Sequence, residues 1–190
     1  ESGNGGNGGA VVIDGGEDFD VTVCGCRFTG NQAGALGGCL FRTPDGPRAP
    51  THVDQSSFEG NSAKNGGAMY FHHSDLTITR STFAGNGAEG SGAIQADDTQ
   101  LDLVNDTFTG NSATKGLGGA ISLFGNGGSI KSCTFAQNHA DGGSGLFGAA
   151  LAGGTSYTID NSLFAGNTSM DCGAPMTCHA GSSSGVGEDR

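Results

Sequence analysis

The sequence predicts an all-β fold, a right-handed single-stranded parallel β-helix of about six coils with roughly 25 residues in each coil. Three observations predict it. A four-residue motif recurs along the chain, aliphatic residues alternate before each copy, and glycine–small–aliphatic triplets lie between copies. Because these features keep nearly fixed offsets from one another, we expect each repeat to form one turn of a solenoid.

The recurring motif is Phe-x-Gly-Asn, with Gln137 in place of the glycine in one copy. Successive phenylalanines are 30, 25, 25, 27 and 29 residues apart. In a solenoid the rings would stack along the interior, and the asparagines would bond to the coils above and below at a bend. The predicted ladder residues are Phe28, Phe58, Phe83, Phe108, Phe135 and Phe164, with Asn31, Asn61, Asn86, Asn111, Asn138 and Asn167.

Aliphatic residues at every second position precede each motif, as in a strand with one buried face. The position five residues before each Phe is held by Val23, Val53, Ile78, Leu103, Ile130 and Ile159. Triplets such as Gly92-Ala93-Ile94 predict a second strand in each coil. We expect right-handed coiling because crossovers between parallel strands favour it strongly.

Two segments break the regular spacing. Residues 42–50 hold three of the four prolines and lengthen the first full coil, so we expect a stiff, protruding loop there. Residues 141–147 are expected to bulge from the fifth coil. Loops on a rigid scaffold often carry function, so both segments are candidates for ligand contact.

The repeat divides the chain into a parallel β-helix at residues 1–170 and a different segment at residues 171–190. Cys172 and Cys178 enclose five residues, and a disulfide between them would hold a C-terminal cap over the open strand edges of the last coil. We expect residues 182–190 to form a disordered tail.

Six cysteines in 190 residues favour an oxidising compartment, and hence a secreted or surface-exposed protein. Cys26 and Cys133 hold the same repeat position four coils apart, which is too far for a disulfide between them. The sequence leaves the state of Cys24 and Cys39 open. No run of about 18 apolar residues predicts a transmembrane segment.

The formal net charge of −11 argues against nucleic acid and anionic membranes as partners. Asp14, Glu17, Asp18 and Asp20 lie close together near the N-terminus without a basic neighbour. They are weak candidates for a Ca²⁺ site, because Ca²⁺ takes several oxygen ligands. A solvated acidic edge is the simpler interpretation, and no other cofactor is expected.

Two further pairs of polar residues are weak candidates for ligands. Asp97-Asp98 is expected in a turn, and His72-His73 follows a predicted strand. Because adjacent strand residues point to opposite faces, we expect the two histidines not to bind one ion together. We assign no catalytic residue, since the basic residues that could assist catalysis are spread among coils: Arg27, Arg80, Lys115 and Lys131.

The motif and the segment Gly118-Gly119-Ala120-Ile121 resemble the Phe-x-x-Asn and Gly-Gly-Ala-Ile repeats of chlamydial polymorphic outer membrane proteins. The repeat is also similar to the pectate-lyase-like β-helices of large secreted bacterial proteins, and the likeness covers about residues 8–170. This resemblance implies a surface-displayed module used in adhesion or as a stalk. The fold also hosts lyases and hydrolases, so the implied function is broad.

Three hypotheses about function follow. The first is a non-catalytic structural or adhesive module of a secreted or cell-surface bacterial protein, whose loops contact a glycan or a protein. The second is a carbohydrate-active enzyme, a polysaccharide lyase or glycosidase, with its site on a face of the solenoid. The third is a subunit that stacks end to end into an extracellular fibre through exposed strand edges.

Overall fold

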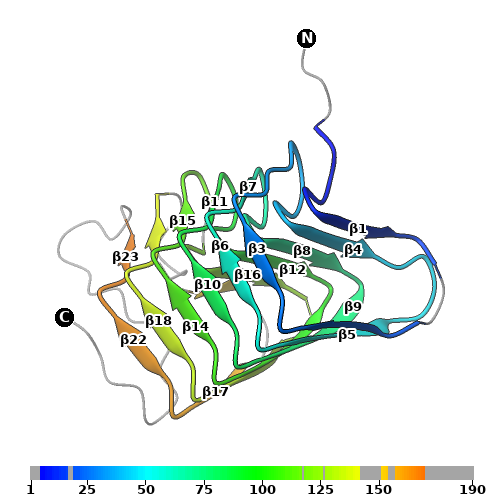
Figure 1. Cartoon of the computed structure of the whole chain (residues 1–190). Helices are drawn as coiled ribbons and strands as arrows, with labels where there is room; N and C mark the ends of the chain where they lie inside the picture. Colours follow the sequence, from blue (N-terminus) through cyan, green and yellow to red (C-terminus); the bar gives the residue numbers. More distant parts are fainter. Residues whose placement is uncertain are drawn as a thin grey trace.

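The computed structural model describes residues 5–16, 19–116, 118–125, 127–141, 151–153 and 157–169. In these ranges the chain winds as a parallel β-helix in which each coil lies against the next (Figure 1). The strands pair in parallel, and the described residues include no helix. Accordingly, none of them forms a helix that could cross a membrane. The predicted fold class is confirmed.

Two of the four sheets form successive sides of each coil and contain the longer strands. Sheet A contains β1 (Val11–Asp14), β4 (Leu40–Thr43), β8 (Met69–His72), β12 (Ile94–Asp97), β16 (Ile121–Phe124) and β20 (Leu151–Gly153). Sheet B contains β2 (Val21–Cys24), β5 (Ala49–Asp54), β9 (Ser74–Thr79), β13 (Gln100–Val104), β17 (Gly128–Lys131) and β21 (Tyr157–Asp160).

The other two sheets contain short strands around the repeated motif. Sheet C contains β3 (Arg27–Thr29), β6 (Ser57–Glu59), β10 (Thr82–Ala84), β14 (Thr107–Thr109), β18 (Thr134–Ala136) and β22 (Leu163–Ala165). Sheet D contains β7 (Ser62–Ala63), β11 (Gly87–Ala88), β15 (Ser112–Ala113), β19 (His139–Ala140) and β23 (Thr168–Ser169). Six stacked strands are joined by five steps, so the described chain makes about five turns, slightly fewer than the six coils predicted.

The phenylalanines of the motif form the predicted column inside sheet C. Neighbouring rings from Phe28 to Phe164 are stacked with centroids 4.7–5.0 Å apart and planes within 9° of parallel. The spacing equals that of the strands, so backbone pairing and ring stacking impose the same register. Leu76, Ile78, Leu101 and Leu103 fill the adjoining interior from sheet B.

The asparagines form the predicted amide ladder directly after the bend between sheets C and D. Asn86 is typical and is fully buried. Its Nδ2 donates to Asn111 Oδ1 and to the carbonyl of Phe58, both at 2.9 Å, and its Oδ1 accepts from Asn61 N and Nδ2. The ladder therefore satisfies the backbone groups that the bend removes from sheet pairing.

Residues with positive φ form a column at each of two bends. Between sheets C and D these are Gly30, Gly60, Gly85, Gly110, Gln137 and Gly166, with φ between 56° and 65°. Between sheets B and C they are Gly25, Gln55, Arg80, Asn105, Ser132 and Asn161, with φ between 47° and 63°. The glycine of the motif is explained by this left-handed conformation, which is costly for most other residues.

Glycine is required in the Gly–small–aliphatic triplet for a different reason. A Cβ at Gly92 would overlap the carbonyl oxygen of Gly119 in the next coil, and Gly38 and Gly67 have equivalent contacts. At these positions glycine allows two coils to approach within the strand spacing, and no positive φ is involved.

The expected loop at residues 42–50 is shorter than predicted. Arg42 and Thr43 belong to β4, and Ala49 and Pro50 belong to β5, so the connection is limited to residues 44–48. Arg42 pairs in register with Ile13 and Phe71 and is only 1% exposed, so it points into the rod. The composition of the segment indicated a protruding loop correctly, but it could not show that its first residues continue a strand.

The described cysteines are free thiols. Cys24 and Cys26 are exposed, whereas Cys39 and Cys133 are buried. Burial raises the pKa of Cys39 to about 12 and that of Cys133 to about 11. The predicted disulfide between Cys172 and Cys178, and the cap and tail at residues 171–190, lie outside the described residues.

Candidate functional site

Three features that the sequence singled out separately meet at the corner between sheets A and B. They are the connection at residues 44–48, the pair His72-His73 and the pair Asp97-Asp98. Arg48, which lies in this connection, contacts carboxylates of the next two coils. Its Nη2 lies 2.5 Å from Asp98 Oδ1, and its Nη1 lies 3.5 Å from Asp75 Oδ1. Because these pairs are half exposed, each contributes well under about 1 kcal/mol to stability, and their main effect is to orient the side chains.

His73 and Asp98 occupy equivalent positions in neighbouring coils and contact each other. His73 Nδ1 lies 2.5 Å from Asp98 Oδ2. Both residues have positive φ, 51° and 45° respectively, so the chain turns both side chains outward. The rings of His72 and His73 lie 6.2 Å apart on the same outer surface. The expectation that the two histidines point to opposite faces was therefore wrong, because His73 lies in a left-handed bend and not in the strand.

Asp97 lies next to this bend, on the outer face of sheet A. Tyr70 Oη donates a 2.6 Å hydrogen bond to Asp97 Oδ2, and Gln95 Nε2 lies 3.1 and 3.0 Å from the two carboxylate oxygens. Partial burial and the bonded Asp97 carboxylate raise the pKa of Tyr70 above its ordinary value, so its hydroxyl stays a donor across the physiological range. The carboxylate is thus fixed in one orientation by two neutral donors.

The neighbours of Asp97 along the rod are aromatic rings. Its register partners are His72 in the coil before and Phe124 in the coil after. His72 is exposed, and Phe124 is 44% exposed, which makes it one of the few large apolar side chains that face solvent in the described chain. An oriented carboxylate therefore lies between two accessible rings on the outer face of sheet A.

The other outward column of sheet A is buried at two of its positions. Phe41 is buried and stacks on Tyr70 with ring centroids 5.7 Å apart. Ser122 is 1% exposed, and its Oγ is a buried side-chain atom without a hydrogen-bond partner in the described part of the chain. A Cβ at Gly118 would overlap the backbone of Ile121 and the Ser122 hydroxyl, so glycine is required beside that oxygen. Phe41 and Ser122 are thus covered, whereas Tyr70 and Gln95 between them are half-buried. The more exposed column is that of His72, Asp97 and Phe124.

Arg42 forms a buried polar centre under the same corner. Its guanidinium donates to the carbonyls of Phe19 (2.6 Å) and Pro50 (2.7 Å), and it also donates to Thr51 Oγ1. The ring of Phe19 covers it, with the guanidinium carbon 5.2 Å from the ring centroid. Burial lowers the pKa of Arg42 from its ordinary value, and the charge of Asp20 opposes that shift. Arg42 therefore stabilises the corner from inside the β-helix and is not accessible to a ligand.

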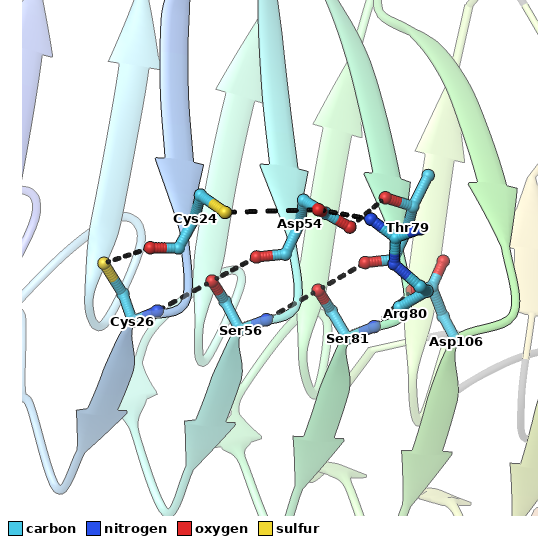
Figure 2. Close-up of polar contacts among 8 residues, drawn as sticks. All are labelled: Cys24, Cys26, Asp54, Ser56, Thr79, Arg80, Ser81 and Asp106. Atoms are coloured by element: carbon cyan, nitrogen blue, oxygen red, sulfur yellow. Dashed lines mark hydrogen bonds and ion pairs between the residues drawn. The ribbon is translucent and has the colours of Figure 1, made fainter.

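A second polar row runs inside the corner between sheets B and C (Figure 2). In successive coils Cys26 N donates to Ser56 Oγ, Ser56 N to Ser81 Oγ and Ser81 N to Asp106 Oδ1, at 3.1, 3.1 and 2.8 Å. Asp106 is 1% exposed, and burial raises the pKa of its carboxyl to about 7, although two backbone N–H groups bond to it. From Ser56 to Asp106 this row is buried and has a structural role.

On the outer surface of the same corner the carboxylate of Asp54 contacts three coils. It accepts from Thr79 Oγ1 at 2.6 Å and pairs with Arg80 at 2.5 Å, and Cys24 Sγ lies 4.0 Å away (Figure 2). The hydrogen bond from Thr79 and the ion pair with Arg80 hold the pKa of Asp54 below its ordinary value. Because its partners already satisfy this carboxylate, it is a weaker candidate for ligand contact than Asp97.

Two of the four predicted Ca²⁺ ligands lie at the first-coil end of the corner between sheets A and B, and the other two are outside the described residues. Asp14 ends β1 on the surface, Asp20 is exposed ahead of β2, and the placement of Glu17 and Asp18 is not described. Among the described residues no three His, Cys, Asp or Glu side chains are grouped so as to hold a metal ion. Of the predicted bulge at residues 141–147, only Asp141 is described, and it pairs with His139 at 2.6 Å.

Sequence reasoning missed Tyr70, Gln95 and Phe124, and it placed Arg48 only within a loop. The register contains the information that would have found two of them. Tyr70 is one coil and two residues before Asp97, so both side chains point to the outer face of sheet A. Phe124 occupies the position equivalent to Asp97 one coil later. Aligning outward positions as carefully as inward ones would have placed these residues together.

Comparisons with protein-family models, with curated proteins and with solved structures gave no match to this chain. The parallel β-helix is therefore established by the strand register alone. The likeness of the repeat to chlamydial polymorphic outer membrane proteins and to pectate-lyase-like proteins stays a resemblance between short motifs.

Proposed function

We propose that this chain is a non-catalytic binding module of a secreted or cell-surface bacterial protein, and that it holds a glycan at the outer corner between sheets A and B. One observation supports this more than any other. The Asp97 carboxylate is held in a fixed orientation by Tyr70 and Gln95 between the accessible rings of His72 and Phe124.

Sugar rings present apolar C–H faces together with a rim of hydroxyl groups. Aromatic side chains cover the faces, and oriented polar groups bond the hydroxyls, which is the common composition of small-ligand sites. Asp97 offers carboxylate oxygens, Gln95 an amide and Phe124 an apolar ring on one surface. Around the bend, His73, Asp98 and Arg48 extend the polar surface along the rod.

A rigid scaffold favours ligand binding more than a flexible surface would. The Phe and Asn ladders fill the interior beneath the sheets, so the outward side chains sit on a backbone with little freedom. Little conformational entropy is then lost when a ligand binds, which raises the affinity that a few contacts can give. The secreted or surface location in this proposal rests on the repeat and on cysteine usage.

A glycan array with the full chain tests the proposal, followed by titration calorimetry on the glycans retained. Phe124→Ala removes the exposed ring, and we expect the affinity to fall about tenfold, which corresponds to about 1.4 kcal/mol. Leu163→Ala is the matched control, since Leu163 is similarly exposed on sheet C. Retention of no glycan, or an equal loss in both variants, would contradict the proposal.

A second candidate function is cleavage of the bound glycan, and one observation favours it. The imidazole of His73 contacts the Asp98 carboxylate at 2.5 Å, directly beside Asp97, so two carboxylates and a histidine share one corner. Such groups serve in general acid–base catalysis. Incubation with each retained glycan and measurement of new reducing ends decides between the two functions, because turnover that disappears in Asp97→Asn would indicate an enzyme.

A further inference from the structure

We infer that the glycan bound at this corner carries free amino groups, so that an ammonium group of the ligand pairs with Asp97. The inference rests on the proposed glycan-binding function and names its ligand class. The inference depends on which charged side chains around the corner already have an oppositely charged partner.

The charges around Asp97 leave its carboxylate without a cation. Its hydrogen-bond donors are the neutral Tyr70 hydroxyl and the neutral Gln95 amide. Within the described ranges no arginine, lysine or histidine forms an ion pair with it. Arg48, whose guanidinium lies on the surface of this corner, is already engaged by Asp75 and Asp98. The negative charge of Asp97 is therefore available to a ligand.

Three other described carboxylates of the outer surface each have a basic partner. Asp54 pairs with Arg80, Glu59 with Arg27 and Glu89 with Lys115, at 2.5, 2.6 and 2.9 Å. Asp97 differs from these three because neutral donors orient it and aromatic rings are its register partners. Two neutral hydrogen bonds do not cancel a formal charge, so an approaching cation gains a charge-assisted bond.

Aromatic rings beside the carboxylate add to the selectivity for a cation. Phe124 is the register partner of Asp97 and is 44% exposed, and the Tyr70 hydroxyl bonds the same carboxylate. An ammonium group next to a ring is attracted by the electron density of its face, by about 0.5–1 kcal/mol at exposed sites. A carboxylate with flanking rings is thus better suited to an amine than to a neutral hydroxyl.

The charge of the whole chain acts in the same direction. With a formal net charge of −11, the chain attracts polycations and repels acidic polysaccharides. This long-range field is weak at physiological salt, where the Debye length is about 8 Å, so the local pairing at Asp97 must provide the specificity.

Titration calorimetry with two matched oligosaccharides tests the inference. One is an oligomer of β-1,4-linked glucosamine, and the other is the same oligomer with every amine acetylated, which removes the charge and keeps the ring. At about pH 6, where aliphatic amines are protonated, we expect the free amine to bind at least about tenfold more tightly. Asp97→Asn should abolish that preference and leave the acetylated oligomer bound as before.

Asp160→Asn is the matched control, because it removes the same charge from an exposed position on sheet B. It should leave both affinities unchanged, and thermal melts should show that both variants fold. Equal binding of the two oligomers, an equal loss of both in Asp97→Asn, or an equal effect of Asp160→Asn would overturn the inference. Those results leave a glycan site in place, whereas failure of the whole glycan array would overturn the proposed function itself.

Discussion

At the scale of single residues, the ladders make each side chain part of its neighbours' hydrogen bonding. Asn86 bonds to Asn61, Asn111 and the carbonyl of Phe58, and all of these groups are buried. Removing one rung therefore leaves donors and acceptors without partners in two other coils. An unpaired buried polar group costs about 1–3 kcal/mol, more than the hydrogen bond contributes on balance.

Asn86→Ala is accordingly expected to lower the free energy of unfolding by about 3 kcal/mol or more. Asn31→Ala is the matched control at the half-buried first rung, where the side chain makes a single ladder bond to Asn61. We expect the control to lose about 1 kcal/mol. Urea unfolding followed by circular dichroism measures both, and equal losses would show that the ladder is not what stabilises the bend.

Asp106 replaces serine in the buried row of Figure 2, and this substitution makes stability depend on pH. Its pKa is about 7 in the fold, against an ordinary value of 3.8, because burial disfavours the charged form. The folded state keeps a proton that the unfolded state has lost, so this contribution is complete below about pH 4 and lost as pH rises through about 7. The difference of about three pKa units sets a ceiling of roughly 4 kcal/mol.

We expect Asp106→Ser to remove this loss, since Ser56 and Ser81 fill the same position in the two preceding coils. The variant should be more stable than the wild type at about pH 8 and show a smaller decline between about pH 5 and pH 8. Asp160→Asn, at an exposed position, should keep the wild-type profile. Parallel profiles for the wild type and Asp106→Ser would refute a raised pKa at Asp106.

Single residues also show which features could be predicted from the sequence and which could not. The Phe and Asn columns could be predicted because one identity recurs at one offset, and the structure confirms both. The corner around Asp97 could not be predicted in the same way. Its residues differ in every coil, and their proximity depends on the register of outward positions, which no repeated identity reveals.

At the scale of elements, glycines make the turns between strands for two distinct reasons. Gly85 lies at a bend with φ of 61°, and the place where a Cβ would lie is open space. Gly92 has no positive φ, but the next coil's backbone lies where a side chain would begin. The first constraint concerns one dihedral angle, and the second concerns the distance between coils.

Two alanine substitutions separate these constraints. Gly85→Ala should cost about 1–2 kcal/mol, because alanine fits but resists the left-handed conformation. Gly92→Ala should prevent folding or cost several kcal/mol, because its Cβ overlaps the Gly119 carbonyl and the coils must separate. Chemical denaturation with a check of soluble yield measures both, and similar losses would show that coil spacing is not the constraint at Gly92.

The connection between β4 and β5 illustrates an element that composition predicts only partly. Prolines indicated an irregular segment at residues 42–50, and residues 44–48 do leave the strand pattern. A buried arginine within an inward column was not predictable from periodicity, which treats charged residues as outward. Arg42 is accommodated because the carbonyls of Phe19 and Pro50 and the hydroxyl of Thr51 bond its guanidinium.

At the scale of the whole molecule, each coil contacts mainly the coils before and after it. The strand pairs join positions separated by one coil length, as in Phe83 with Phe58 and Phe108. Stability is then close to a sum of coil and interface terms, as in other solenoids. This is why one repeat unit sufficed to predict the architecture, while the number of turns, the connections and the outer surface required the complete structure.

The same organisation predicts that a complete coil can be removed. Thr82 and Thr107 are register partners, so deletion of residues 82–106 joins Ser81 to Thr107 at the equivalent position. We expect a shorter β-helix with an unchanged β spectrum per residue and a lower free energy of unfolding, since an interface between coils is lost. Deletion of residues 82–93 is the control, because it joins Ser81 to Ile94 out of register and should yield an unfolded or aggregated chain. Folding of both deletions, or of neither, would mean that register between coils does not govern this fold.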